Sequence, residues 1–300
     1  MPSSPPGAVL RRPGLFALVK GASQALFSEV LDLVYPEPAP CLLCRGPGEP
    51  DRTIRVCSAC TDRIAHIGRP RCSRCGRAIS SRKAPSARSA KALTCSECNR
   101  SRQAFDYCRA YGVYEGYLRA LIHQVKYGKD AAAAQGLGEL MAWVVACDPG
   151  YGRIDAVVAV PLHPRRLAER GFNQAALLAE RVAWGIRRPM VDAVARVQET
   201  SPQSKLPYSE RGKNVRRAFA VTRPHLVKGK RILIVDDVLT TGATLSAVAR
   251  ALKRAGAARC AAVCAAAGSL DADFDAAPVL GRQDRASGDS SVGTEIGAFD

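Results

Sequence analysis

The sequence predicts an α/β protein in which a parallel sheet is flanked by helices and preceded by a cysteine-rich head. Three observations lead to this fold class. Two short, wholly apolar runs, 156–160 and 232–235, have the length and composition of strands that are buried on both faces of a sheet. Helical patterns alternate with these runs, as connections between parallel strands require. Four Cys-x-x-Cys pairs lie within residues 41–98, where large apolar side chains are scarce.

The predicted elements follow one another from residue 105 onward. Apolar and polar residues alternate over 107–114, which is typical of an edge strand. The helix over 244–254 carries an apolar face and ends before Gly256, a residue suited to a helix C-terminus. The remaining predicted elements are helices over 118–125, 137–145 and 173–184 and strands over 156–160, 232–235 and 259–265.

Composition divides the chain into four parts. Residues 1–36 combine a Pro/Ser/Arg-rich start, which we expect to be disordered, with an amphipathic helix. Residues 37–104 form the cysteine-rich head, which contains a flexible basic loop over 80–91. Residues 105–267 hold the α/β pattern. Residues 268–300 are small, polar and acidic, and this composition predicts a disordered tail.

The charge of the chain favours anionic partners. The sequence holds 44 Lys and Arg residues against 27 Asp and Glu residues, a net charge of +17. Such a balance suits nucleic acid or a small phosphorylated substrate, and equally a solvated basic surface with no specific partner. No apolar run approaches the roughly 20 residues of a membrane span, so we expect no membrane insertion.

The cysteine pairs predict two structural zinc sites. Paired Cys-x-x-Cys knuckles with these spacings are typical of zinc ribbons. A region with too few large apolar residues to form a hydrophobic core needs a bound metal to stabilise it. Consecutive pairs can share a metal, or the first pair can join the third; the sequence fits both arrangements. Thiolate ligands also suit a reducing compartment and so a cytoplasmic location. The expected zinc ligands are Cys41, Cys44, Cys57, Cys60, Cys72, Cys75, Cys95 and Cys98. The other four cysteines, expected to be buried apolar residues, are Cys108, Cys147, Cys260 and Cys264.

The head is also strongly basic, which raises the possibility of a nonspecific grip on single-stranded DNA. No aromatic residue lies between Tyr35 and Phe105, and this weakens the part of that hypothesis that depends on base stacking.

The most informative segment runs from Ile232 to Thr244, a strand, two aspartates, a Thr/Gly loop and a helix start. We expect the strand to end at the carboxylates of Asp236 and Asp237, where ligands bind in open α/β sheets. Amides at the start of the following helix, together with the threonine hydroxyls, form a phosphate cradle. Carboxylates repel phosphate but accept hydrogen bonds from a sugar diol, so the predicted ligand contains ribose 5-phosphate. The expected phosphate-binding residues are Thr240, Thr241, Gly242, Ala243 and Thr244.

This segment resembles the signature of type I phosphoribosyltransferases, whose fold is Rossmann-like. The resemblance implies that Asp236 and Asp237 contact the ribose hydroxyls of phosphoribosyl pyrophosphate (PRPP) bound with Mg²⁺, and that the following loop holds its 5′-phosphate. It also implies that Leu162 and His163, after the preceding strand, contact pyrophosphate through their backbone. Arg165 and Arg170 would then stabilise the charge of the leaving pyrophosphate.

Further pieces narrow the resemblance to the ComF competence family, over roughly residues 31–266. They are Leu162-His163, the run Arg170-Gly171-Phe172-Asn173-Gln174, Lys126 with Gly128, Gln203, Arg211 with Asn214, and Ala218-Phe219. ComF-like heads resemble double zinc ribbons, in agreement with the cysteine spacing. The resemblance implies that Lys126 reaches pyrophosphate and that Gln203, Arg211 and Asn214 lie in a loop covering the site. We expect His163 to shape its turn rather than to act as a general base.

Two functions follow from these patterns. The first is an enzyme: a Mg²⁺-dependent phosphoribosyltransferase, a glycosyltransferase that transfers the pentosyl group to an unknown acceptor. The resemblance to the ComF family implies that it acts in DNA uptake during natural competence. The alternative is a protein without turnover that binds single-stranded DNA, or senses a ligand, through the same fold. Both readings allow single-stranded DNA and other competence proteins as partners.

Overall fold

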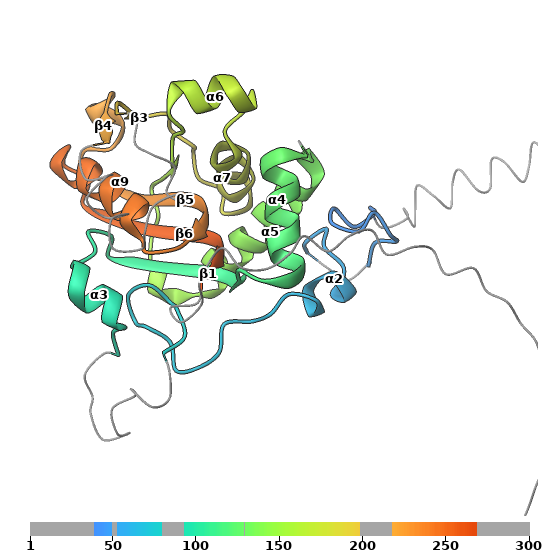
Figure 1. The fold of residues 1–300 in the computed structure, drawn as a ribbon. Coiled ribbons are helices and arrows are strands. Elements are labelled where there is room, and N and C mark those ends of the chain that lie inside the picture. The colour runs from blue at the N-terminus through green and yellow to red at the C-terminus, as the bar shows by residue number, and fades with distance from the viewer. Residues whose placement is uncertain (1–38, 50–52, 80–92, 129, 199–217, 269–300) are drawn as a thin grey trace, which may run out of the picture.

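The structure is a computed structural model that describes residues 39–49, 53–79, 93–128, 130–198 and 218–268. Its centre is a four-stranded sheet in the order β1-β6-β5-β2, with every neighbouring pair parallel (Figure 1). The strands are β1 (Tyr107–Val113), β2 (Ala156–Ala159), β5 (Arg231–Leu239) and β6 (Arg259–Ala267). The predicted fold class, a parallel sheet flanked by helices, is confirmed.

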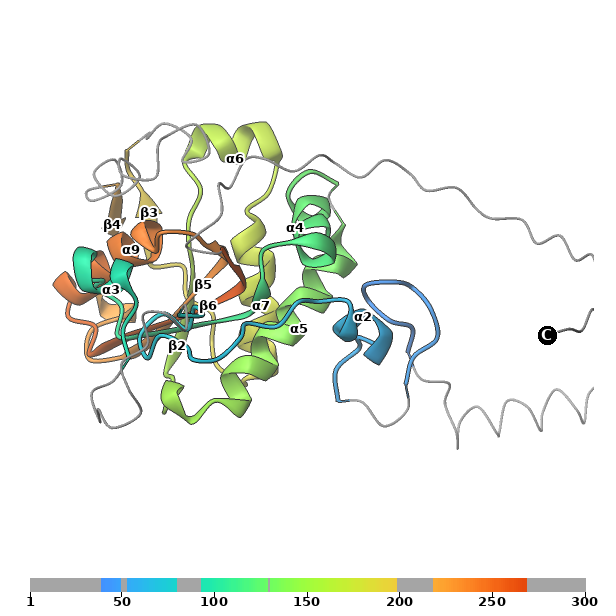
Figure 2. The same cartoon turned by 60° about the horizontal axis from the view of Figure 1, so that its bottom comes forward.

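Helices cover both faces of this sheet. Helices α5 (Ala131–Cys147) and α7 (Gln174–Gly185) pack on one face, and α4 (Gly116–Tyr127) lies against α5 on the same side (Figure 2). Helix α9 (Ala243–Arg254) packs on the other face, beside the antiparallel pair β3 (Val194–Arg196) and β4 (Phe219–Val221). The short α6 (Pro164–Arg170), η2 (Pro149–Tyr151) and η4 (Pro224–Leu226) lie in the connections.

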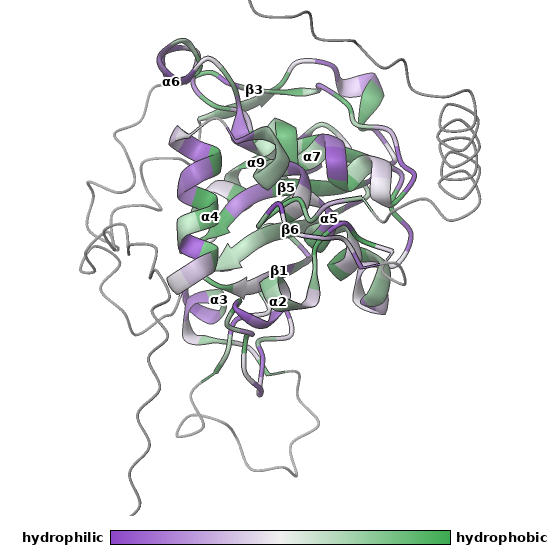
Figure 3. Ribbon diagram, turned by 90° about the vertical axis from the view of Figure 1, so that its right-hand side faces the viewer, coloured by the Kyte–Doolittle hydropathy of each residue, from purple (hydrophilic) through white to green (hydrophobic). Residues whose placement is uncertain are grey.

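Side chains of the central strands alternate between two cores. Leu233 and Val235 point to the α5–α7 side, whereas Ile232 and Ile234 point to the α9 side. All four are fully buried, as the apolar run predicts for a central strand. The hydropathy colouring in Figure 3 shows β6 in the green of apolar residues, while α4 carries both green and purple turns. The buried residues of α4 are Leu118, Leu121, Ile122 and Val125.

The cysteine-rich head divides between the two faces. The first half, with α2 (Ser58–Asp62), packs on the α4–α5 side, where Cys41 and Cys60 join the core. The second half, with α3 (Ser96–Ser101), packs on the α9 side, where Cys72 and Cys95 join the other core. The two halves of the head therefore pack on opposite faces of the sheet (Figures 1 and 2).

Two predictions need correction. Strand β5 does not end at Val235 but continues through both aspartates to Leu239, because β6 extends as far as Ala267 and remains paired with it. On its other edge, β2 pairs with β5 only as far as Val235, which leaves the aspartates beside an unpaired edge. Cys147 is exposed, since it is the last residue of α5, whereas Cys108, Cys260 and Cys264 are buried as expected.

Several predicted features lie outside the described residues. They are the start and amphipathic helix within 1–36, the basic loop over 80–91, the loop with Gln203, Arg211 and Asn214, and the tail over 269–300. Within the part of the chain that is described, no helix is long and apolar enough to cross a membrane.

Candidate active site and metal centres

A cavity of about 340 Å³ opens at the carboxyl ends of β2 and β5. It lies at the edge where β2 ends before β5 does, the place where ligands bind in open α/β sheets. Both aspartates of the strand–loop–helix segment line it, and so do residues from α4, α6, α7 and β3. The residues predicted from the sequence that line it are Lys126, Leu162, Arg170, Asp236, Asp237, Thr240, Gly242 and Thr244.

The acid pair is fixed by neighbouring side chains. The ammonium group of Lys126 lies 3.1 Å from Oδ2 of Asp237, and the same oxygen accepts a hydrogen bond of 3.1 Å from the side-chain amide of Gln174. The carbonyl oxygen of the Gln174 amide accepts in turn from Arg170, also at 3.1 Å. Asp237 is 8% exposed, so this network holds its carboxylate in one position at the edge of the cavity.

Burial and charge shift the pKa values of this cluster. Desolvation, and then the neighbouring carboxylate of Asp237, raise the pKa of Asp236 to about 8. The backbone amide of Asp237 donates a hydrogen bond of 2.9 Å to Oδ1 of Asp236. This hydrogen bond lowers the pKa of Asp236, but by less than burial raises it. Burial is the largest single influence on the pKa of Lys126 and lowers it, but Asp237, Tyr114 and Asp236 together outweigh burial, so the pKa of Lys126 is raised. In the ligand-free site the lysine thus stays charged, while Asp236 holds a proton through neutral pH.

The loop after the acid pair has the geometry of a phosphate cradle. Gly242 is the residue before α9, and its φ of 80° lies in the left-handed region that favours glycine. The hydroxyl of Thr241 accepts a hydrogen bond of 3.2 Å from the amide of Ala243. Thr240, Gly242 and Thr244 face the cavity, whereas Thr241 and Ala243 are not among its lining residues. The start of α9 therefore directs its positive end toward the space beside the aspartates.

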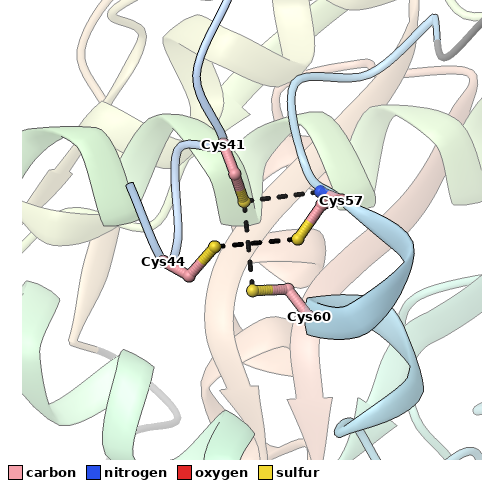
Figure 4. A group of neighbouring side chains, drawn as sticks. All are labelled: Cys41, Cys44, Cys57 and Cys60. Carbon is pink, nitrogen blue, oxygen red and sulfur yellow. Dashed lines mark hydrogen bonds between the residues drawn. The ribbon is translucent and has the colours of Figure 1, made fainter. Parts of the chain in front are cut away.

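The first cysteine group lies outside this cavity. Cys41, Cys44, Cys57 and Cys60 point toward one another from two knuckles (Figure 4). The sulfur of Cys41 lies 3.9 Å from that of Cys60, and the sulfur of Cys44 lies 3.7 Å from that of Cys57. Zn–S bonds of about 2.3 Å in a tetrahedron place sulfurs about 3.8 Å apart, so the four thiols fit zinc.

The second group, Cys72, Cys75, Cys95 and Cys98, is wholly buried, and Cys75 and Cys95 have sulfurs 3.6 Å apart. Hydrogen bonds among its sulfurs lower the pKa of Cys72 and raise that of Cys98. The four thiols cannot all ionise side by side without a cation, which is the charge balance that a zinc ion provides. Both groups join consecutive pairs, which decides between the two arrangements that the spacing allowed.

Two family models match different parts of the chain. The family model of the phosphoribosyl transferase domain matches residues 126–282, and that of the double zinc ribbon domain matches residues 30–99. A DNA utilization protein, YhgH of Escherichia coli, is 33% identical over 225 residues, which cover 74% of this chain and 93% of that protein. Competence protein ComFC of Bacillus subtilis is 28% identical over 72% of this chain and 89% of that protein. This chain belongs to the ComF family.

Among solved structures, the glutamine phosphoribosylpyrophosphate amidotransferase of Bacillus subtilis is 20% identical, with a TM-score of 0.32 over 45% of this chain and 26% of that chain. A likeness of that size carries no detail of the site.

Besides Thr241 and Ala243, two other predicted site residues of this ComF chain do not line the cavity. Arg165 pairs with Glu169 at 3.5 Å on the exposed side of α6 and does not line the cavity, whereas its neighbour Arg166 does. His163 precedes α6, and its ring nitrogen accepts from the amide of Arg165 at 3.4 Å. That contact lies within the turn before α6, and His163 is not among the residues that line the cavity.

The cavity also contains residues that the sequence did not single out. Arg119 and His123 lie on α4 seven and three residues before Lys126, so helical periodicity was the signal that could have found them. Arg196 lies in the three-residue strand β3, where no motif marks it. Burial, and then the charge of Arg166, lower the pKa of Arg196, although it remains a cation at neutral pH.

Proposed function

We propose that the cavity binds PRPP with Mg²⁺ and that the protein transfers its phosphoribosyl group to a nucleophile. In this reaction the bond between C1′ of the ribose and the pyrophosphate oxygen breaks, and pyrophosphate leaves with the electron pair. A new bond forms between C1′ and the acceptor, which loses a proton. The acceptor is not identified by any group in the cavity.

The observation that carries this proposal is the acid pair beside the phosphate cradle in one cavity. A sugar diol suits Asp236 and Asp237, because ionised carboxylates accept hydrogen bonds and donate none. A 5′-phosphate suits the backbone of Thr240 to Thr244 at the start of α9. Only a ligand that joins a diol to a phosphate over a short distance satisfies both, and ribose 5-phosphate is such a ligand.

The basic residues of the cavity suit pyrophosphate. Arg166, Arg170 and Arg196 line the cavity together with Lys126, and so does Leu162. Cations fixed before the reaction stabilise charge that develops on a leaving group without reorganisation. Mg²⁺, bound with the pyrophosphate, would neutralise part of the same charge. Of the predicted cations, Arg170 is supported in this role, and Arg166 is a better candidate than Arg165.

Two measurements test the proposal. Calorimetry with PRPP and Mg²⁺ above pH 8, where Asp236 is ionised, should give binding to the natural chain and at least about tenfold weaker binding to Asp236→Asn, which loses a charged acceptor of the diol. Glu169→Gln on the exposed side of α6 is the matched control and should bind like the natural chain. Release of pyrophosphate, with candidate acceptors supplied, then separates turnover from binding. Absence of binding to both PRPP and ribose 5-phosphate would overturn the proposal.

A second function is favoured by a different part of the surface. Arg74, Arg250, Lys253 and Arg254 line a groove between the second half of the head and α9, with Asp106 as its acidic residue. The relatives are named for DNA utilization and competence. We propose that the protein handles single-stranded DNA in the cytoplasm during DNA uptake, with other competence proteins.

Binding of the protein to labelled single-stranded DNA should weaken steeply as the salt concentration rises. Arg250→Glu should reduce it, and binding unaffected by salt and by this variant would exclude the groove.

A further inference from the structure

The phosphate loop is held from behind by the cysteine-rich head. The side-chain amide of Gln103, which follows the second cysteine group, donates a hydrogen bond of 3.0 Å to the carbonyl oxygen of Thr241. Gln103 is 7% exposed and Thr241 is 5% exposed, so water does not replace this contact. Neither residue lines the cavity, which means that Gln103 reaches the loop from the side opposite the ligand.

Two further contacts fasten the same segment to the loop. The amide of Ala104 donates to the hydroxyl of Ser246 at 2.9 Å, and Ser246 lies in the first turn of α9. Gly242 lies so close that a Cβ added to it would be 3.3 Å from the side chains of both Gln103 and Phe105. The residue with the left-handed backbone is thus packed directly against the segment that leaves the head.

Gln103 is itself held by both knuckles of the second cysteine group. Arg74, between Cys72 and Cys75, donates to the backbone carbonyl of Gln103 at 3.1 Å. The side-chain amide of Gln103 also donates to the hydroxyl of Ser101 at 2.8 Å. Ser101 donates in turn to Glu97, the residue before Cys98. An unbroken series of contacts therefore runs from the sulfur cluster to the carbonyl oxygen of Thr241.

We infer that Gln103 is a positioning residue for the sugar-phosphate site and that the metal of the second cysteine group, rather than that of the first, keeps the phosphate loop in its binding conformation. The inference rests on the proposed function for its ligand. Its physical reason is that a loop pre-organised around an anion binds it without the cost of ordering. The first cysteine group packs on the opposite face of the sheet and contributes no contact among the described ones to this loop.

Gln103→Leu tests the inference, because it removes the donor and nearly keeps the volume. Gln124→Leu, the same change on the exposed face of α4, is the matched control. In the ligand-free chain, hydrogen exchange of the amides over 240–246 should become about fivefold faster in Gln103→Leu and stay unchanged in Gln124→Leu. Affinity for PRPP with Mg²⁺ should fall by about the same factor.

Two cysteine variants test the role of the metal. Cys98→Ser, which breaks the second group, should reproduce the faster exchange of the loop, whereas Cys41→Ser, which breaks the first, should not. Should Cys98→Ser fail to fold, zinc chelation in Cys41→Ser, which keeps only the second group intact, should give the same faster exchange, and unchanged exchange in either experiment would overturn the role of the metal. Loop exchange unchanged in Gln103→Leu would overturn the inference, even with PRPP binding intact. If the natural chain does not bind PRPP but Gln103→Leu still speeds exchange of the loop amides, PRPP is excluded as the ligand. The role of Gln103 in positioning the loop is then retained.

Discussion

Replacing Lys126 by methionine should destabilise the ligand-free protein by about 2 kcal/mol near pH 8. The substitution keeps most of the side-chain length and removes the cation that lies 3.1 Å from Asp237. The Lys126 and Asp237 side chains are 20% and 11% exposed, so their pair lies between two known cases. Exposed pairs contribute about 0–1 kcal/mol, and breaking a fully buried pair costs about 3–5 kcal/mol. Gln174 still donates to Asp237 in the variant, which limits the loss.

The loss should depend on pH in a defined direction. The pKa of Asp236 is about 8 in the folded chain and near its ordinary value in the unfolded chain, so the folded state binds more protons between these values. Stability therefore falls as pH rises toward 8. Without the lysine, which lowers the pKa of Asp236, that pKa rises further, so the part of the penalty due to Asp236 grows as pH rises toward 8 and above. At about pH 5 this part is absent, because Asp236 is protonated with or without the lysine.

Urea unfolding at about pH 5 and pH 8 measures this effect. Lys253→Met is the matched control, since Lys253 pairs with Asp106 at 2.6 Å but both side chains are 37% exposed. Its loss should stay below about 1 kcal/mol at either pH. Adding Asp237→Asn to Lys126→Met should recover stability at pH 8. Equal losses at both pH values, or no recovery in the double variant, would refute the reasoning about the acid pair.

Three other results are expected. Gly112→Ala should lower the melting temperature by several degrees, because the added Cβ would lie 2.6 Å from Ile64 and 2.9 Å from the carbonyl oxygen of Ala65. Gly68→Ala is the control and should leave the melting temperature unchanged, since its added Cβ would have no atom within 4 Å. Equal melting temperatures for the two variants would contradict the packing around Gly112. Metal analysis should find two zinc ions in the natural chain and one in the double variant Cys41→Ser/Cys60→Ser; loss of both would favour interleaved pairs. Affinity for ribose 5-phosphate should rise with pH up to about 8, because Asp236 must lose its proton to accept hydrogen bonds from the diol. An affinity that calorimetry finds constant over this pH range would argue against Asp236 as an acceptor for the diol.

Local sequence was sufficient for the parts of the protein whose chemistry lies within a few neighbouring residues. The run from Ile232 to Thr244 carries its strand, acid pair and helix start in thirteen consecutive positions, so the cradle could be predicted before any packing was known. The Cys-x-x-Cys spacing likewise sets a metal knuckle, because two thiols at that distance point to one side of a tight turn.

The tertiary structure decided what depends on direction and on distant partners. Arg165 and Arg166 are adjacent, but successive residues of a helix point about 100° apart, so only one of them faces the cavity. The pairing of the cysteine knuckles, the contact of Lys126 with Asp237 and that of Gln103 with Thr241 join residues from 13 to 138 positions apart. Such contacts exist only once the sheet has assembled, because packing of the helices and head against it brings those side chains together.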